Sequence, residues 1–143
     1  MTVYDRPTLE ALIDAARMHL ETAIIPAVKG DARLYFQSLV AANILKIAAR
    51  QASLEAAHLQ MLWEGMNALQ ASDEPLDGDP EHLHLRLEAR RTDLCAAIRA
   101  GTYDAEDRAA PLLDHLLRAT RLQLEVANPK FLEALDAEDR AGG

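Results

Sequence analysis

The 143-residue sequence contains a single cysteine, Cys95, and only six aromatic residues. One cysteine excludes an internal disulfide framework and a metal site built from several cysteines. The scarcity of aromatics means that the core must be aliphatic. No run of about 18 apolar residues is present, so we expect no membrane span. The N-terminus lacks the basic start and apolar stretch of a signal peptide, which makes a cytoplasmic location the default expectation.

Motifs for covalent or phosphate chemistry are missing as well. None of the three serines lies in a Gly-x-Ser-x-Gly elbow, and the six glycines are scattered rather than gathered in a phosphate-binding loop. The formal net charge is −8, the reverse of the balance usual in nucleic-acid-binding domains. We therefore predict no catalytic residue, no cofactor and no nucleic-acid partner.

The residues that dominate the sequence favour helix. It holds 27 alanines and 23 leucines against 16 residues of Val, Ile and Thr together. Ala and Leu lose little conformational freedom in a helix, whereas β-branched residues favour strands. We predict an all-α protein, with residues 1–143 forming a single-domain bundle of five to six helices.

Helix boundaries in the first half follow from capping residues and from proline. Thr8 can cap a first helix, which Pro26 should bend or end. Asp31 is the expected cap of the next helix. One helix over residues 31–70 would be about 60 Å long. Because that length is unusual in a small domain, we expect a break near residues 51–53.

The second half of the sequence has clearer signals for where helices begin and end. Residues 72–80 form an acidic linker, and Asp79 followed by Pro80 is typical of a helix start. That helix should end at Gly101, with Ile98 on its inner face. The last long helix should become regular near Pro111 and stop at residues 128–129. A short apolar turn and a polar tail from about residue 136 should follow.

The most informative polar residues lie on one face of the predicted second helix. Helical spacing places five candidate binding or interface residues there: Arg33, Phe36, Gln37, Asn43 and Arg50. Asn43 has small and apolar neighbours, and an unpaired buried amide costs about 1–3 kcal/mol. Asn43 should therefore tie two core helices together or set the register at an interface. Residues 1–71 are near neutral and residues 72–143 are strongly acidic, which favours self-association through the N-terminal half. We expect a homodimer.

An alternative, metal-dependent function rests on the pair Glu55-x-x-His58. At this spacing both side chains share a helix face, as in di-iron bundles, but those sites need two such pairs and two further carboxylates. A dimer would be required to supply the second pair. Arg33 and Arg50 could bind the phosphate or carboxylate of an acyl-CoA in the same alternative.

Four short motifs make the chain resemble a known family. They are Arg6-Pro7-Thr8, the segment from Arg33-Leu34-Tyr35-Phe36 to Val40-Ala41-Ala42-Asn43, Ile98-Arg99-Ala100-Gly101, and Asn128-Pro129-Lys130-Phe131. Over about residues 5–131 they resemble an uncharacterised bacterial domain family. The chain departs from that family's pattern in lacking a glycine near residues 51–55.

The resemblance implies a functional context. Members of that family stand alone or are fused to aminoglycoside-phosphotransferase-like kinases, and they are encoded near acyl-CoA dehydrogenases. No catalytic residue is transferred by the resemblance. It implies a non-catalytic accessory or interaction protein whose partner is a kinase-like protein or an acyl-CoA dehydrogenase.

Overall fold

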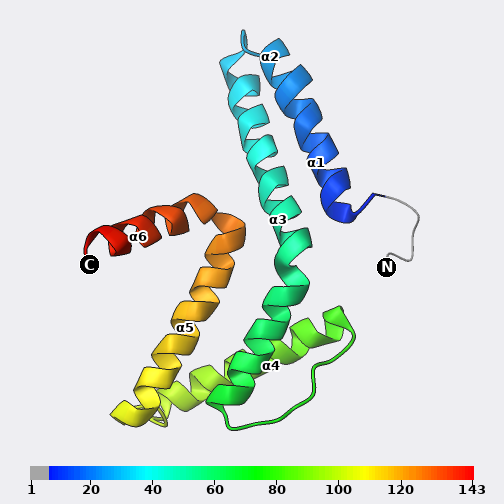
Figure 1. The fold of residues 1–143 in the computed structure, drawn as a ribbon. Helices are drawn as coiled ribbons and strands as arrows, with labels where there is room; N and C mark the ends of the chain where they lie inside the picture. The colour runs from blue at the N-terminus through cyan, green and yellow to red at the C-terminus, as the bar shows by residue number, and fades with distance from the viewer. Residues whose placement is uncertain (1–6) are drawn as a thin grey trace. The chain divides into compact units, whose positions relative to one another are not determined.

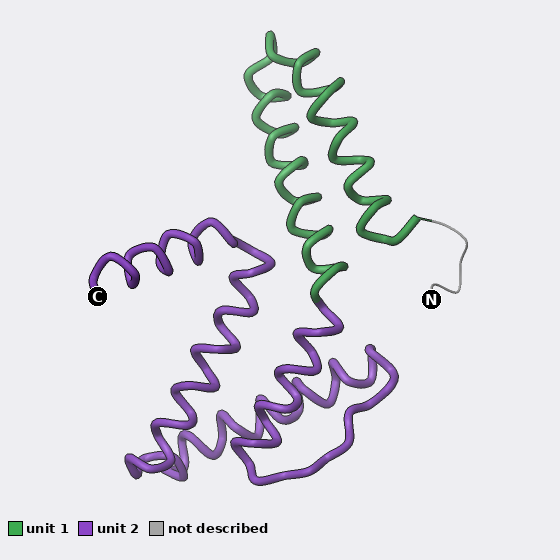
Figure 2. The backbone as a smooth tube through the Cα atoms, viewed as in Figure 1, with its two compact units in different colours: residues 1–54 green, residues 55–143 purple. Residues whose placement is uncertain are grey.

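The computed structural model describes residues 7–143, so Arg6 of the first family motif lies outside the described residues. The described residues form helices and no strand, which confirms the all-α prediction (Figure 1). The helices are α1 (Leu9–His19), η1 (Leu20–Ile24), α2 (Ile25–Ala27), α3 (Ala32–Leu69), α4 (Pro80–Arg99), α5 (Glu106–Ala127) and α6 (Pro129–Ala141). Two compact units divide the chain within α3, Met1–Leu54 and Glu55–Gly143 (Figure 2). The single-domain organisation stays a prediction.

Unit 1 is a helical hairpin whose first arm begins where the sequence predicts. The Thr8 hydroxyl accepts a hydrogen bond from the Ala11 backbone N–H at 3.1 Å. The arm ends at Ala27, one residue after Pro26, which confirms that this proline lies at the predicted end. A proline ring collides with the carbonyl four residues earlier. The chain absorbs that collision in the π-helical turn η1, where the Ile25 backbone N–H donates to the Leu20 carbonyl, five residues back.

The second arm belongs to α3, which is one uninterrupted helix of 38 residues. It begins as predicted, with an Asp31 carboxylate oxygen accepting from the backbone N–H groups of Arg33 and Leu34, each at 3.0 Å. The predicted break near residues 51–53 is wrong. Residues 45–60 hold no proline or glycine, and their alanines, glutamines and leucines favour helix. Length alone is not a reason for a helix to break.

Unit 2 contains the hydrophobic core. Its buried members come from α3, α4 and α5: Leu59, Trp63, Met66, Leu83, Leu87, Leu94 and Leu112. The inward-facing prediction for Ile98 fails, because this residue, in the last turn of α4, is 36% exposed. None of the described helices is long and apolar enough to cross a membrane.

The ends of α4 match the sequence prediction. An Asp79 carboxylate oxygen accepts from the Glu81 backbone N–H at 3.0 Å, and Pro80 occupies the first helical turn. Gly101 ends the helix with a φ of 83°, a left-handed conformation that a side chain would strain.

The C-terminal helices differ from the prediction. α5 begins at Glu106, five residues before Pro111, which lies inside the helix. Glu106 and Asp107 in the first turn complement the helix dipole, and Pro111 is accommodated in the second turn. The expected short turn and polar tail are instead the 13-residue helix α6. Asn128 caps it by accepting from the Phe131 backbone N–H, and Arg121 bonds Asp136 at 3.0 Å.

Candidate interaction surface

Within unit 1, one face of α3 is turned toward the first arm of the hairpin. Ala42 and Ala49 on this face are buried, with exposures of 4% and 5%. Lys46 lies between them on the same face, and its ammonium pairs with the Glu21 carboxylate at 3.1 Å. Small alanines at seven-residue spacing allow close approach of a neighbouring helix. This face is therefore the seam of the hairpin.

The opposite face of α3 carries the stripe that the sequence singles out. At 100° per residue, Arg33, Phe36 and Val40 lie 120–180° around the helix from Ala42. Four of the five predicted residues are exposed on this side of the helix: Arg33, Phe36, Gln37 and Asn43. We call this the outer face of α3. Arg50 lies only about 80° around the helix from Ala42 and is half-buried at the edge of the seam.

The Asn43 side chain does not lie in a core, which corrects one of the two expectations for it. It is exposed, although its neighbours along the sequence are apolar. The prediction took the apolar residues next to Asn43 in the sequence to be buried around it in the structure. On the outer face they are not, since Ile44 beside it is 58% exposed.

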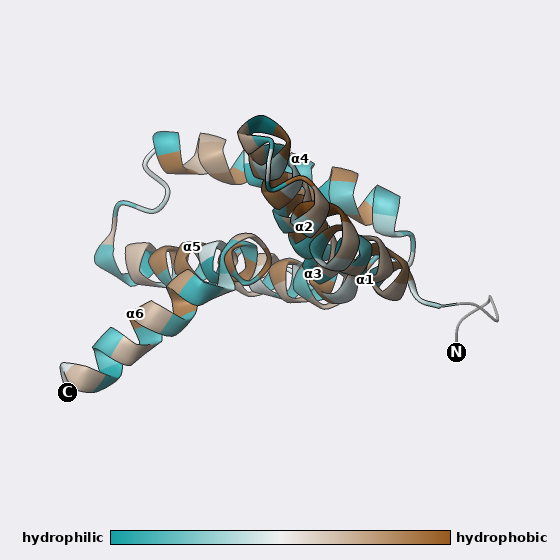
Figure 3. Ribbon diagram, turned by 90° about the horizontal axis from the view of Figure 1, so that it is seen from above, coloured by the Kyte–Doolittle hydropathy of each residue, from teal (hydrophilic) through white to brown (hydrophobic). Residues whose placement is uncertain are grey.

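Large apolar side chains are left in solvent on both arms of unit 1. They are Leu9, Leu12, Met18, Leu34, Phe36, Leu39, Val40 and Ile44, with exposures from 42% to 66%. Both α1 and α3 carry hydrophobic residues along their ribbons, coloured brown in Figure 3. In the described part of unit 1, the buried apolar residues are only Ile25, Ala42 and Ala49. Two alanines and one isoleucine provide little of the burial that holds helices together in water. The hairpin thus exposes the kind of surface that helices normally bury.

The charge of unit 1 is compatible with close contact between copies. Residues 1–54 carry six bases and five acids, whereas residues 55–143 carry nine bases and eighteen acids. Like charge at −9 opposes the approach of two unit 2 surfaces, and near-neutral surfaces lack this repulsion. Among the described residues, Arg17 bonds both Asp14 at 3.1 Å and Glu21 at 2.6 Å, and these carboxylates raise its pKa.

The structure does not bring Glu55 and His58 to a common ligand position. His58 Nε2 lies 2.9 Å from a Glu125 carboxylate oxygen on α5. Glu55 lies 3.0 Å from His84 Nε2 on α4. Residues 7–143 contain no cluster of three or more His, Cys, Asp or Glu side chains placed to hold a metal ion. The metal alternative stays a prediction, and it would require both residues to leave these partners.

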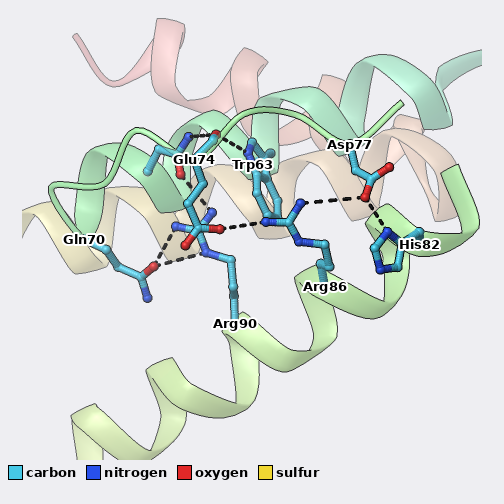
Figure 4. Close-up of polar contacts among 8 residues, drawn as sticks. Trp63, Gln70, Glu74, Asp77, His82, Arg86 and Arg90 are labelled. Carbon is cyan, nitrogen blue, oxygen red and sulfur yellow. Dashed lines mark hydrogen bonds and ion pairs between the residues drawn. The ribbon is translucent and has the colours of Figure 1, made fainter. Parts of the chain in front are cut away.

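Sequence reasoning missed the most connected polar site, which surrounds Trp63 in unit 2 (Figure 4). This tryptophan is 1% exposed, and the guanidinium groups of Arg86 and Arg90 lie 4.6 and 4.5 Å from its ring centre. The indole N–H donates to the Glu74 carbonyl at 2.9 Å. An isolated tryptophan followed by two arginines on the next helix was the available signal.

The Trp63 site fixes the acidic linker to the helices. Arg86 pairs with Glu74 at 2.9 Å and with Asp77 at 3.7 Å, and Asp77 also contacts His82. The Asp79 backbone N–H, followed by His82 and Arg86, lowers the pKa of Asp77. Buried Arg90 donates to Asn67 and Gln70 side-chain oxygens at 2.7–3.2 Å. Residues 72–79 are thus part of the folded unit.

The model of a domain of unknown function, DUF6285, matches residues 26–131. The chain belongs to this family. The match includes three of the four motifs and excludes Arg6-Pro7-Thr8. No curated protein and no solved structure matches the chain.

Proposed function

We propose that this protein is a non-catalytic accessory protein that self-associates through the outer face of α3. The observation that carries the proposal is the set of exposed apolar residues on a hairpin with almost no core of its own. A second hairpin laid against the first would form a four-helix bundle, in which apolar faces from all four helices meet. Asn43 would then lie at the interface, where a polar side chain sets register.

The outer face of α3 reaches the contact area of an ordinary dimer only when the interface extends along the whole stripe. A stable interface buries about 800 Å² on each partner. Phe36, Val40 and Ile44 extend over two helical turns, and Arg33 and Arg50 lie toward the ends of the stripe. An apolar centre with arginines at its rim is the usual composition of such an interface.

Sedimentation velocity over a concentration series tests this proposal. The wild type should sediment as a dimer, and Phe36→Glu should shift it to monomer because it buries a carboxylate in an apolar contact. Leu85→Glu is the matched control, since Leu85 on α4 is also 66% exposed. It should remain dimeric. A wild type that is monomeric at every concentration, or equal dissociation in both variants, would contradict the proposal.

The partner is the part of the proposal that rests on the family resemblance alone. We propose a kinase-like protein of the aminoglycoside-phosphotransferase type or an acyl-CoA dehydrogenase, with a cytoplasmic location. Co-elution of the purified chain with a purified acyl-CoA dehydrogenase or kinase of the same organism tests it. A complex that survives gel filtration supports the assignment, and separate elution of all three proteins contradicts it.

A further inference from the structure

Three adjoining cavities lie between α3 and α5 in unit 2, and Arg118 lines each of them. The central one, of about 220 Å³, is also lined by Gly65, Ala68, Leu69, Pro111, Asp114 and His115. A larger one, of about 470 Å³, is bordered by Met61, Leu117 and Leu122 among others. The third, of about 300 Å³, continues along α3 from Met61 to Ala68. Together they form an α3–α5 groove lined by apolar side chains, by Arg118 and Arg121, and by the carboxylates of Glu64, Asp114 and Glu125.

Gly65 allows His115 to reach the central cavity. A Cβ placed on Gly65 would lie 2.8 Å from the imidazole Nδ1 and 3.1 Å from Cε1, closer than atoms can approach. The absence of a side chain at position 65 is therefore what admits the imidazole against α3. His115 is half-buried there, whereas Arg118, one turn later, is exposed. Both side chains border the same cavity.

The His115 imidazole is surrounded by basic side chains, although the protein is acidic overall. Burial first, and then the guanidinium groups of Arg118, Arg91 and Arg90, lower the pKa of His115, and no carboxylate opposes them. Within residues 7–143, Arg118 makes no hydrogen bond or ion pair. Among the other charged groups along the groove, Arg121 pairs with Asp136 and Glu125 contacts His58. The Glu64 carboxylate accepts a hydrogen bond from the Gln60 side-chain amide at 2.9 Å. Asp114 lines the cavity without an ion pair to Arg118.

We propose that the α3–α5 groove binds a small amphipathic anion. Its carboxylate or phosphate group would pair with Arg118 beside His115, and its apolar part would lie along Met61, Leu117 and Leu122. An arginine provides charge-assisted hydrogen bonds to such oxyanions, and apolar walls with a few polar groups are typical of ligand sites. The groove belongs to unit 2, so this inference does not depend on the proposed self-association.

Titration of the full chain with three octyl compounds tests the proposal. The probes are octanoate, octyl phosphate and 1-octanol, and the readout is the NMR shift of the His115 Hε1 proton with the dissociation constant that it yields. At least one anionic probe should bind saturably, about tenfold or more tightly than the neutral alcohol. Whichever anion binds more tightly identifies the oxyanion that the site prefers. Equal binding of all three probes, or no saturable shift with either anion, overturns the proposal.

Two variants locate the site. Arg118→Gln should weaken binding of the anionic probe about tenfold or more. Arg140→Gln near the end of α6 removes the same charge, and it should change the affinity less than twofold. Because Arg118 is exposed, its replacement should leave the helical circular dichroism unchanged. Equal weakening in both variants would mean attraction to overall charge and would overturn the assignment to Arg118.

Discussion

Replacement of Trp63 by phenylalanine tests how much the Trp63 site contributes to the stability of unit 2. The substitution keeps an aromatic ring in the core and removes the indole N–H that donates to the Glu74 carbonyl at 2.9 Å. It also replaces the ring on which Arg86 and Arg90 lie. The Glu74 carbonyl keeps a second donor, the Asn67 side-chain amide at 2.9 Å, so no carbonyl is left unpaired.

The expected loss of stability in Trp63→Phe is the sum of three contributions. A neutral hydrogen bond contributes about 1 kcal/mol, and the exchange of tryptophan for phenylalanine weakens each cation–π contact by about 0.5 kcal/mol. The smaller ring loses about 1 kcal/mol of apolar burial. Trp63→Phe should therefore lower the free energy of unfolding by about 2–3 kcal/mol. Trp63→Ala should lower it by about 3–5 kcal/mol, because it also opens a cavity.

Urea unfolding followed by circular dichroism at the helical band is the assay, since Trp63 is the one tryptophan of the chain and its fluorescence is lost in the variant. Leu85→Ala, at a position 66% exposed, is the control and should change stability by less than about 0.5 kcal/mol. Limited proteolysis should cut residues 72–79 faster in Trp63→Phe than in the control. A Trp63→Phe variant as stable as the control, with an equally protected linker, would refute the reasoning.

Three further predictions concern single residues of unit 2. Gly65→Ala should displace His115 and so shift its imidazole Hε1 resonance in the NMR spectrum, whereas Gly78→Ala, which meets nothing within 4 Å, should leave that resonance in place. The gain of about 1 kcal/mol in helix propensity should offset the cost of moving His115, so the free energy of unfolding should change little in the urea assay. Asp79→Ala should lower the free energy of unfolding by about 0.5–2 kcal/mol, because it removes the α4 cap. An equal change in the exposed control Asp73→Ala would contradict a stabilising role of the cap. NMR titration should give a His115 pKa below 6.5 that rises in Arg118→Gln. A lowered pKa in the folded protein means that the unfolded chain binds the His115 proton more tightly. His115 should therefore reduce the free energy of unfolding as the pH falls below about 6.5, and His115→Gln should lessen this loss of stability.

Local signals in the sequence were sufficient for most helix ends. Thr8, Asp31 and Asp79 cap helices as their hydroxyl and carboxylate groups predict, and Asn128 caps α6. Capping is a contact between residues two or three apart, so it can be inferred from sequence alone. The continuity of α3 and the early start of α5 could not be inferred in this way. Both depend on whether the helix propensity of the surrounding residues is high enough to continue a helix over a long span or past a proline.

The placement of side chains around the helices was harder to predict. The helical period put Phe36 and Asn43 on one face of α3, yet it did not show that this face is exposed, since either side of a helix can be turned to the core. The pairs His58–Glu125 and His84–Glu55 join different helices. They depend on tertiary packing that no spacing encodes. For the same reason, the contacts of Trp63 with Arg86 and Arg90 could not be predicted from the sequence.

Self-association through the outer face of α3 is tested most directly by the native mass spectrum of the purified chain. We expect a species of twice the 15.7 kDa chain mass, without added mass from a metal ion. The same spectrum of Phe36→Glu should show the single chain. A wild-type spectrum at one chain mass would contradict the interface, and stoichiometric iron or zinc would contradict a non-catalytic role and favour Glu55 and His58 as ligands.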